Sequence, residues 1–410
     1  MHQALTKPGH PEAAVNMLTG VKQRVISVDI LRGAVMIIMA LGHVRHLLHL
    51  PALVEEPTDL VTTTPVLFFT RWVSHYCAPT FVFLAGISIF LTGQNKPIRD
   101  HSAFIMKRGL WLVFVELFII TFGLTFNPLY KMFILQVIWA TGWSMAALGL
   151  LMRTSPKVIL AVGLVLFLGH NLLDYTSLPQ QGAAGFLWKF LFTTRGDLLP
   201  LGSSHNIYLV YAILPWTGIM LLGYSLGPVF KKDFDAARRR RILNITGISL
   251  LVLFVLLRII NQYGDPAPWG LQKNGLFTFM SFVNVTKYPV SLQYGCLTIG
   301  PVLLILSAID SLRGKFAGFL AMFGRVAFFY YVLHFFLIHL IIMILFFATG
   351  HTWQEAMAAD SPFLFRPYNF GFSLGAVYML WIVVVAMLYK PCKWFVHYKQ
   401  THRQWWLRYL

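Results

Sequence analysis

The sequence predicts an all-α polytopic membrane protein with about ten transmembrane helices, and two observations support this fold class. Of its 410 residues, 57% are hydrophobic and only 12% are charged, whereas soluble globular domains carry about 25% charged residues. Apolar runs of about 20 residues, the length that crosses a hydrocarbon core of about 30 Å, recur along the whole chain. This composition excludes an ordinary soluble enzyme.

The expected helices are ten apolar runs that are separated by Pro, Gly and clusters of charge. They occupy residues 26–47, 68–93, 108–127, 132–152, 157–176, 206–227, 242–261, 290–309, 326–348 and 372–391. If both chain ends are cytoplasmic, 23 of the 33 Lys and Arg residues fall on the inner side, as the positive-inside rule requires. The chain then divides into a cytoplasmic segment 1–25, a transmembrane domain 26–391 and a basic, aromatic cytoplasmic tail 392–410. We expect a multi-pass protein of the plasma (inner) membrane.

The net charge of +18 comes from 33 Lys and Arg against 15 Asp and Glu. Because the inner loops of membrane proteins collect basic residues, we expect no nucleic acid as a partner. The run Arg238–Arg241 either anchors the topology on anionic lipid headgroups or receives a cytosolic polyanion such as a nucleotide-containing cofactor. Arg239 is our candidate contact for the second case. The three cysteines have no metal-ligand spacing, so no metal is expected.

The first span carries two ionisable groups, Asp29 and Arg32, at a depth where charge is costly. Three residues apart on a helix, they lie on one face and can form an ion pair. His43 follows eleven residues after Arg32, which returns it to within about 20° of the same face, about 16 Å further along the helix. Asp29 and Arg32 could merely neutralise each other, and His43 could be a structural histidine. Because Arg32 and His43 share one helix face, however, Asp29 and His43 are candidate catalytic residues.

The second and third spans each contain one unusual polar feature. Pro79 cannot donate to the carbonyl of His75, so the helix should break there and leave that acceptor free. His75 is therefore a second candidate catalytic group on the outer side, with an interfacial histidine as the plain alternative. Glu116 has no Lys or Arg within one helical turn. Its side chain must therefore be neutral or paired with a residue of another helix.

Arg325 directly precedes the ninth span, which places Tyr330 and His334 four residues apart on one face. These two side chains could form a proton relay or a buried hydrogen-bonded pair.

Four segments resemble known membrane acyltransferases. Ser27–Gly33 followed by His43 is similar to the first-helix motif of the acyltransferase-3 family. The same segment with Ala78–Gly86 resembles the heparan-alpha-glucosaminide N-acetyltransferase group and its bacterial relatives, and so do residues 214–224 and 324–334. The resemblance implies a fold of ten to eleven helices that takes an acyl group from cytosolic acyl-CoA and delivers it to an acceptor, often a sugar, on the far side.

The resemblance also implies residue roles. It makes His43 the catalytic histidine and Arg32 its arginine partner. Glucosaminide acetyltransferases, however, use a histidine of the outer segment between the first two spans, so the identity of the base stays open. The candidate catalytic residues are His43, Asp29 and His75, and the candidate donor contacts are Arg32, Arg325, His334 and Arg239.

The chemistry agrees with this reading. A thioester is already activated, so the protein needs only a base for the acceptor, and a neutral imidazole suits that task near physiological pH. The expected partners are acyl-CoA (acetyl-CoA foremost), a sugar amine or hydroxyl and the lipid bilayer, with a homodimer left open. Whether the acyl group passes through an acyl-histidine or moves directly also stays open.

The alternative function is a proton-coupled secondary transporter of a small molecule, with Asp29, Arg32, His43 and Glu116 along its path. Transporters commonly have two repeated halves. The later half of this sequence contains no second copy of the Asp/Arg motif, which disfavours the transporter function.

Overall fold

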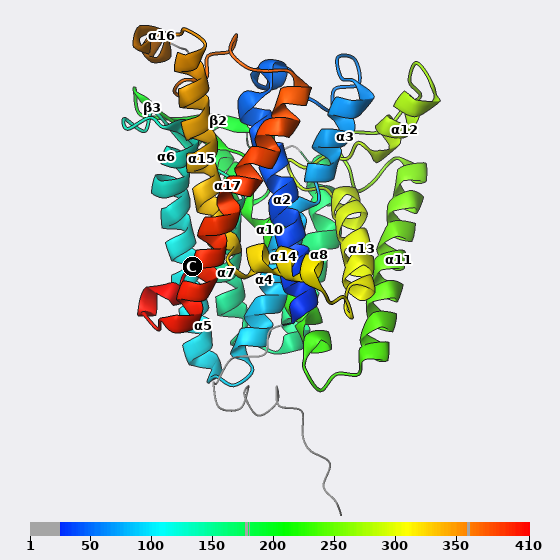
Figure 1. Ribbon diagram of the computed structural model, residues 1–410. Helices are drawn as coiled ribbons and strands as arrows, with labels where there is room; N and C mark the ends of the chain where they lie inside the picture. Colours follow the sequence, from blue (N-terminus) through cyan, green and yellow to red (C-terminus); the bar gives the residue numbers. More distant parts are fainter. Residues whose placement is uncertain (1–24, 177–178, 180, 359–360) are drawn as a thin grey trace, which may run out of the picture.

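The computed structural model describes residues 25–176, 179, 181–358 and 361–410. Long helices lie side by side, and a small sheet and short helices cap one end of the bundle (Figure 1). We call this end, which carries the strands, α12 and α16, the sheet end, and the opposite end, where α5 and α11 begin, the basic end. The predicted segment 1–25 lies outside the described residues except for Val25.

The helices and strands are these. The helices are α2 (Ile26–Leu48), α3 (Pro65–Ser74), α4 (Cys77–Gly93), α5 (Ile98–Val115), α6 (Thr121–Thr125), α7 (Val137–Leu151), α8 (Pro156–Gly169), α9 (Gly182–Leu191), α10 (Ile213–Leu226), α11 (Ala236–Ile260), α12 (Gly275–Val283), α13 (Leu292–Ala308), α14 (Lys315–Arg325), α15 (Ala327–Ala348), α16 (Trp353–Ala358) and α17 (Leu374–Thr401). A π-helical turn, Glu116–Ile120, joins α5 to α6. The strands β1 (Met132–Leu135), β2 (Asp197–Leu201) and β3 (His205–Leu209) form a sheet of order β1-β3-β2, in which β3 is parallel to β1 and antiparallel to β2.

The helical membrane class is confirmed. Within the described part of the chain, seven helical segments are long and apolar enough to cross a membrane, and two further apolar helices, α7 and α13, are shorter. Each of the ten predicted runs contains a helix. The number of membrane crossings, ten, stays a prediction. The side of the membrane on which the two termini lie also stays a prediction.

Several predicted spans differ from the observed helices at their ends: α5 begins at Ile98 and α11 at Ala236, before the expected starts at residues 108 and 242. The runs 132–152 and 206–227 begin with β1 and β3, which pair with one another before α7 and α10 start. The helix α17 continues to Thr401, beyond the expected boundary at residue 391, because Cys392 and Phe395 are still buried against the core.

A close crossing of α2 and α14 positions the groups at the basic end. A Cβ on Gly33 would lie 1.8 Å from the carbonyl oxygen of Leu320, and one on Gly324 would lie 1.9 Å from that of Asp29. Only glycine permits two helix backbones to approach so closely. The crossing therefore holds the end of α14, with Arg325, beside Asp29.

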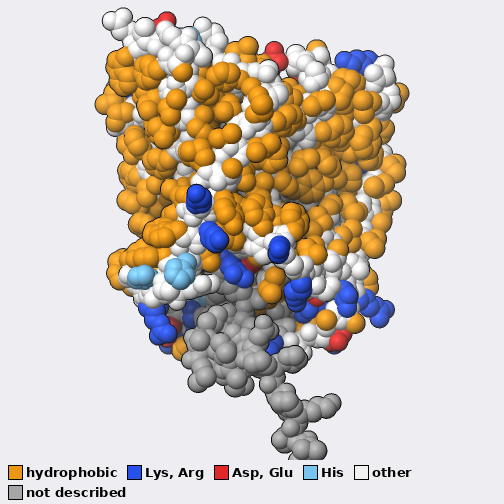
Figure 2. Space-filling view, in the orientation of Figure 1, with side chains coloured by type: hydrophobic (Ala, Val, Ile, Leu, Met, Phe, Trp, Pro, Cys, Tyr) orange, Lys and Arg blue, Asp and Glu red, His pale blue; other side chains and the backbone are white. Residues whose placement is uncertain are grey.

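The surface agrees with a membrane location. Figure 2 shows hydrophobic side chains over most of the visible face, with Lys and Arg gathered toward the basic end. Exposed apolar side chains on α11 include Ile245, Val252 and Ile259. Water would disfavour such a surface, whereas lipid tails solvate it.

Candidate functional site

Two histidines from opposite halves of the chain meet inside the bundle. His43 on α2 and His334 on α15 lie with Nδ1 of the first 2.7 Å from Nε2 of the second. Their rings stack with centroids 4.9 Å apart, and Phe335 packs on the His43 ring at 4.6 Å. His334 is fully buried, whereas His43 keeps some accessible surface. We call these two residues the histidine pair.

The surroundings of the histidine pair fix which nitrogen carries each proton. His334 Nδ1 lies 2.5 Å from the carbonyl oxygen of Tyr331, which can only accept, so this nitrogen donates. In neutral His334, Nε2 is then an acceptor, and His43 Nδ1 must donate to it. The lone pair of His43 is therefore on Nε2, which makes no hydrogen bond to any residue that the structure describes. An imidazole held in this way can take a proton or attack a carbonyl carbon.

Tyr330 does not complete the predicted relay. Its ring stacks on His334 at 5.8 Å, but its buried hydroxyl has no hydrogen-bond partner among the described residues. The interpretation of Tyr330 and His334 as a hydrogen-bonded pair is therefore wrong, because both nitrogens of His334 are already occupied.

A second polar cluster lies at the basic end of α2. The predicted ion pair is confirmed: the guanidinium of Arg32 lies 3.2 Å from Asp29, and it also donates to Ser88 Oγ at 2.7 Å and to the Gly324 carbonyl at 3.4 Å. Arg325 Nε approaches the other oxygen of Asp29 to 3.9 Å.

A third guanidinium adds to this cluster. Arg108 of α5 lies within electrostatic range of Arg32, and its buried Nε has no partner in the described part of the chain. Arg32 and Arg325 thus flank the Asp29 carboxylate, and Arg108 adds a third positive charge near Arg32. We call these three arginines the arginine cluster. The excess positive charge suits a phosphate or another oxyanion, which a guanidinium binds through two parallel hydrogen bonds.

The helix break predicted at Pro79 is present. The helix α3 ends at Ser74 and α4 begins at Cys77. The freed carbonyl of His75 accepts a hydrogen bond from the Tyr294 hydroxyl at 2.6 Å. The His75 side chain packs near the Tyr294 ring at 5.6 Å, and its Nδ1 is buried without a partner among the described residues. His75 is not a member of the histidine pair.

Among the described residues, Glu116 pairs with a backbone N–H and with no cation. It begins the π-helical turn, a local irregularity that is frequent at functional sites. One carboxyl oxygen accepts the backbone N–H of Gln136 at 2.7 Å, and the other is buried with no partner in the described residues. The two predicted alternatives, a neutral Glu116 or one that is paired with a residue of another helix, stay open.

Arg239 pairs with an acid outside the arginine cluster, Asp310. Its guanidinium holds one oxygen of Asp310 at 2.7 and 3.1 Å, which ties the start of α11 to the segment after α13. An acyl donor that binds Arg239 would have to share the guanidinium with Asp310.

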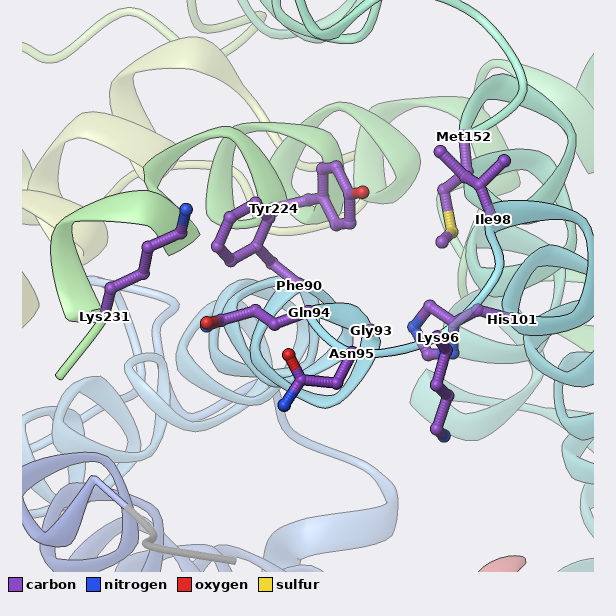
Figure 3. Close-up of a pocket in the computed structure, with 10 residues that line it drawn as sticks. All are labelled: Phe90, Gly93, Gln94, Asn95, Lys96, Ile98, His101, Met152, Tyr224 and Lys231. Atoms are coloured by element: carbon purple, nitrogen blue, oxygen red, sulfur yellow. The ribbon is translucent and has the colours of Figure 1, made fainter. Parts of the chain in front are cut away.

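A cavity of about 490 Å³ opens at the basic end between α4, α5 and α10. Figure 3 shows Lys231 at one side and Lys96 at the other, with the amides of Gln94 and Asn95 between them. Tyr224 lines the wall. In the sequence these lysines were indistinguishable from ordinary positive-inside residues, so the cavity could not be predicted.

Comparison with known proteins identifies a family that matches the first part of the chain. Residues 24–258 match the family model described as heparan-alpha-glucosaminide N-acetyltransferase, catalytic. The matched stretch is more than half of the chain and includes Asp29, Arg32, His43 and His75, whereas His334 and Arg325 lie beyond it. No curated protein matches the chain.

Proposed function

The chain belongs to the heparan-alpha-glucosaminide N-acetyltransferase family, and from this premise we propose that it transfers an acyl group, expected to be acetyl, from cytosolic acyl-CoA to an acceptor across the membrane. The acceptor is a sugar amine or hydroxyl. The basic end faces the cytoplasm of a plasma membrane, in keeping with the positive-inside rule. Both chain ends lie on that side.

The single observation that carries the proposal is the hydrogen bond between His43 Nδ1 and His334 Nε2, which leaves the lone pair of His43 on Nε2. His43 removes the proton from the acceptor nucleophile as it attacks the thioester carbonyl and the C–S bond breaks. In the alternative route, His43 Nε2 attacks the carbonyl and the CoA thiolate departs; the acceptor then takes the acyl group from the imidazole and releases its proton to the thiolate. His334 is a positioning residue, since it accepts from His43 Nδ1 and holds the imidazole in the required tautomer. The proton that His43 takes up then passes to the departing thiolate.

The charge distribution supports donor entry from the basic end. The arginine cluster and the two lysines of the 490 Å³ cavity offer cations to the phosphates of CoA. Arg32 and His43 are separated by about 16 Å along α2. An extended pantetheine arm can bridge such a gap, so the nucleotide can stay near the arginines while the thioester reaches the histidine pair.

The first test is binding of acetyl-CoA to detergent-purified protein, read as a concentration-dependent rise in Tm. We expect a saturable rise that dephospho-CoA does not reproduce. A saturable rise justifies a search for the acceptor with labelled acetyl-CoA. No rise with any acyl-CoA contradicts the proposal and favours the proton-coupled transporter, for which uptake assays on Glu116 and His43 variants follow.

A further inference from the structure

Residues 363–366, which lie between α16 and α17, bind the end of α2, the helix that carries His43. We call these residues the clamp. Its Arg366 is fully buried, and the guanidinium donates through Nε to the carbonyl oxygen of Leu47 at 2.6 Å and through Nη2 to that of His49 at 2.8 Å. The last carbonyls of a helix have no partner within the helix, and a positive charge there suits the helix dipole. Arg366 therefore closes the end of α2.

The clamp is also fastened to α15, the helix that carries His334. On that helix, His339 Nε2 lies 2.7 Å from the carbonyl oxygen of Leu364, and His339 Nδ1 lies 2.9 Å from that of Leu124 in α6. The backbone N–H of Leu364 donates to the carbonyl oxygen of Thr125 at 2.9 Å. The clamp thus joins α2 to α15 and α6.

Two further features indicate that the clamp has one fixed conformation. The ring of His46, which follows His43 by about one turn of α2, meets the ring of Phe363 edge to face at 5.9 Å. The buried Phe365 has a φ of 63°, in the left-handed region that bulky side chains seldom adopt. Such a backbone conformation persists only where the surrounding contacts hold it, and it is frequent at functional sites.

The histidine pair lies between two fixed contacts of α2. The crossing of α2 and α14 holds the helix toward the basic end, and the clamp holds its other end. His43 is four residues before Leu47, and His334 is five residues before His339, which is about 6 and 7.5 Å along the two helices. The 2.7 Å contact between the two imidazoles is therefore little more than one turn from the clamp.

We infer that Arg366 is a positioning residue for the transfer reaction, because it keeps His43 of α2 against His334 of α15. This inference rests on the proposed function, in which the contact between the two imidazoles sets the tautomer of His43. If α2 moves by about 1 Å relative to α15, a contact of 2.7 Å becomes too long for a hydrogen bond. A misplacement of about 1 Å in a catalytic group can cost about a hundredfold in rate.

A second buried arginine provides a matched control. Arg258 of α11 is 1% exposed and donates to the backbone carbonyls of Phe282 and Asn284 at 2.8 Å and of Ser281 at 2.9 Å. Its hydrogen-bond acceptors in the described part of the chain lie on α12, beside α12 and on α13, and none of them is on α2 or α15. Arg258 thus stabilises the fold in a similar way without holding the histidine pair.

The test compares Arg366→Lys with Arg258→Lys. The assay is release of CoA thiol from acetyl-CoA by native membrane vesicles that contain the acceptor, with the rate given per folded molecule. A lysine keeps the positive charge but loses the planar fork of donors, so both variants should lower the Tm. We expect Arg366→Lys to lower kcat about tenfold or more at an unchanged KM for acetyl-CoA. Arg258→Lys should keep the wild-type kcat.

A double variant separates positioning from a general loss of stability. If Arg366 acts through the contact of His43 with His334, the variant Arg366→Lys/His334→Ala should be no slower than His334→Ala alone. Residues that act as one unit are not additive, whereas independent losses multiply.

Two results would overturn the inference: Arg366→Lys keeps the wild-type kcat, or its loss of rate multiplies with that of His334→Ala. If Arg366→Lys does not fold, Phe363→Leu, which removes the ring contact with His46, decides the question in the same comparison. Its kcat should fall in the wild-type background and stay constant in the His334→Ala background.

The same assay distinguishes failure of this inference from failure of the proposed function. A wild-type protein that releases thiol, together with either overturning result, removes only the role of Arg366. A wild-type protein that releases no thiol and shows no rise in Tm with acetyl-CoA removes the proposed function and, with it, this inference.

Discussion

Replacing His334 tests whether it positions His43 or contacts the donor. In His334→Ala, the Nδ1–H of His43 loses its acceptor inside the bundle. A buried donor left without a partner costs about 1–3 kcal/mol. If this cost falls on the transition state, and about 1.4 kcal/mol is a factor of ten, the rate should fall by about 5- to 150-fold.

His334→Gln is the informative companion to this variant. A glutamine carbonyl can reach the region of His334 Nε2 and accept from His43, so it preserves the tautomer. We expect His334→Gln to be faster than His334→Ala, because it keeps a hydrogen-bond acceptor for His43. The double variant His43→Ala/His334→Ala should be no slower than His43→Ala alone, because the two residues act as one unit.

The assay is release of CoA thiol from acetyl-CoA by native membrane vesicles that contain the acceptor, recorded over a range of acetyl-CoA concentrations. A positioning role lowers kcat and leaves the KM for acetyl-CoA unchanged. The reasoning is refuted if His334→Ala raises that KM at constant kcat, since His334 would then be a donor contact. It is also refuted if His334→Gln is as slow as His334→Ala.

Three further variants test other parts of the site and fold. Arg32→Ala should weaken acetyl-CoA binding about tenfold or more, read by the Tm titration, and an unchanged affinity would exclude Arg32 as a donor contact. Gly324→Ala should lower the Tm by several degrees, because its Cβ would collide with the Asp29 carbonyl, and overpacking costs about 1–3 kcal/mol. Gly318→Ala on the same helix, with open space around its Cβ, is the control and should not lower it. Glu116→Gln should keep CoA release near the wild-type rate, since an amide oxygen can still accept from Gln136; complete loss would indicate that an ionised Glu116 is required.

Local sequence signals predicted the parts of the site that depend on neighbours along the chain. The ion pair of Asp29 and Arg32 follows from their i, i+3 spacing, and the helix break at His75 follows from Pro79. Helix geometry and the missing N–H of proline are enough to predict these two features.

Contacts between distant segments could not be predicted in the same way. His43 and His334 are 291 residues apart, and no pattern at either position specifies the other. The small sheet was missed since β1 and β3 sit at the ends of apolar runs that periodicity alone assigns to helices.

The crossing of α2 and α14 has a consequence for which changes of chain length this protein can accept. Gly33 and His43 are ten residues apart on α2, and Gly324 and His334, which meet them, are also ten residues apart. Each added or deleted residue would turn a following helical position by about 100°. A single insertion or deletion in 34–42 or 325–333 would therefore keep the glycine crossing and turn one imidazole away from the other. Homologous chains that keep both the glycine crossing and the histidine pair should have these two intervals at fixed length, even where their loops vary in length.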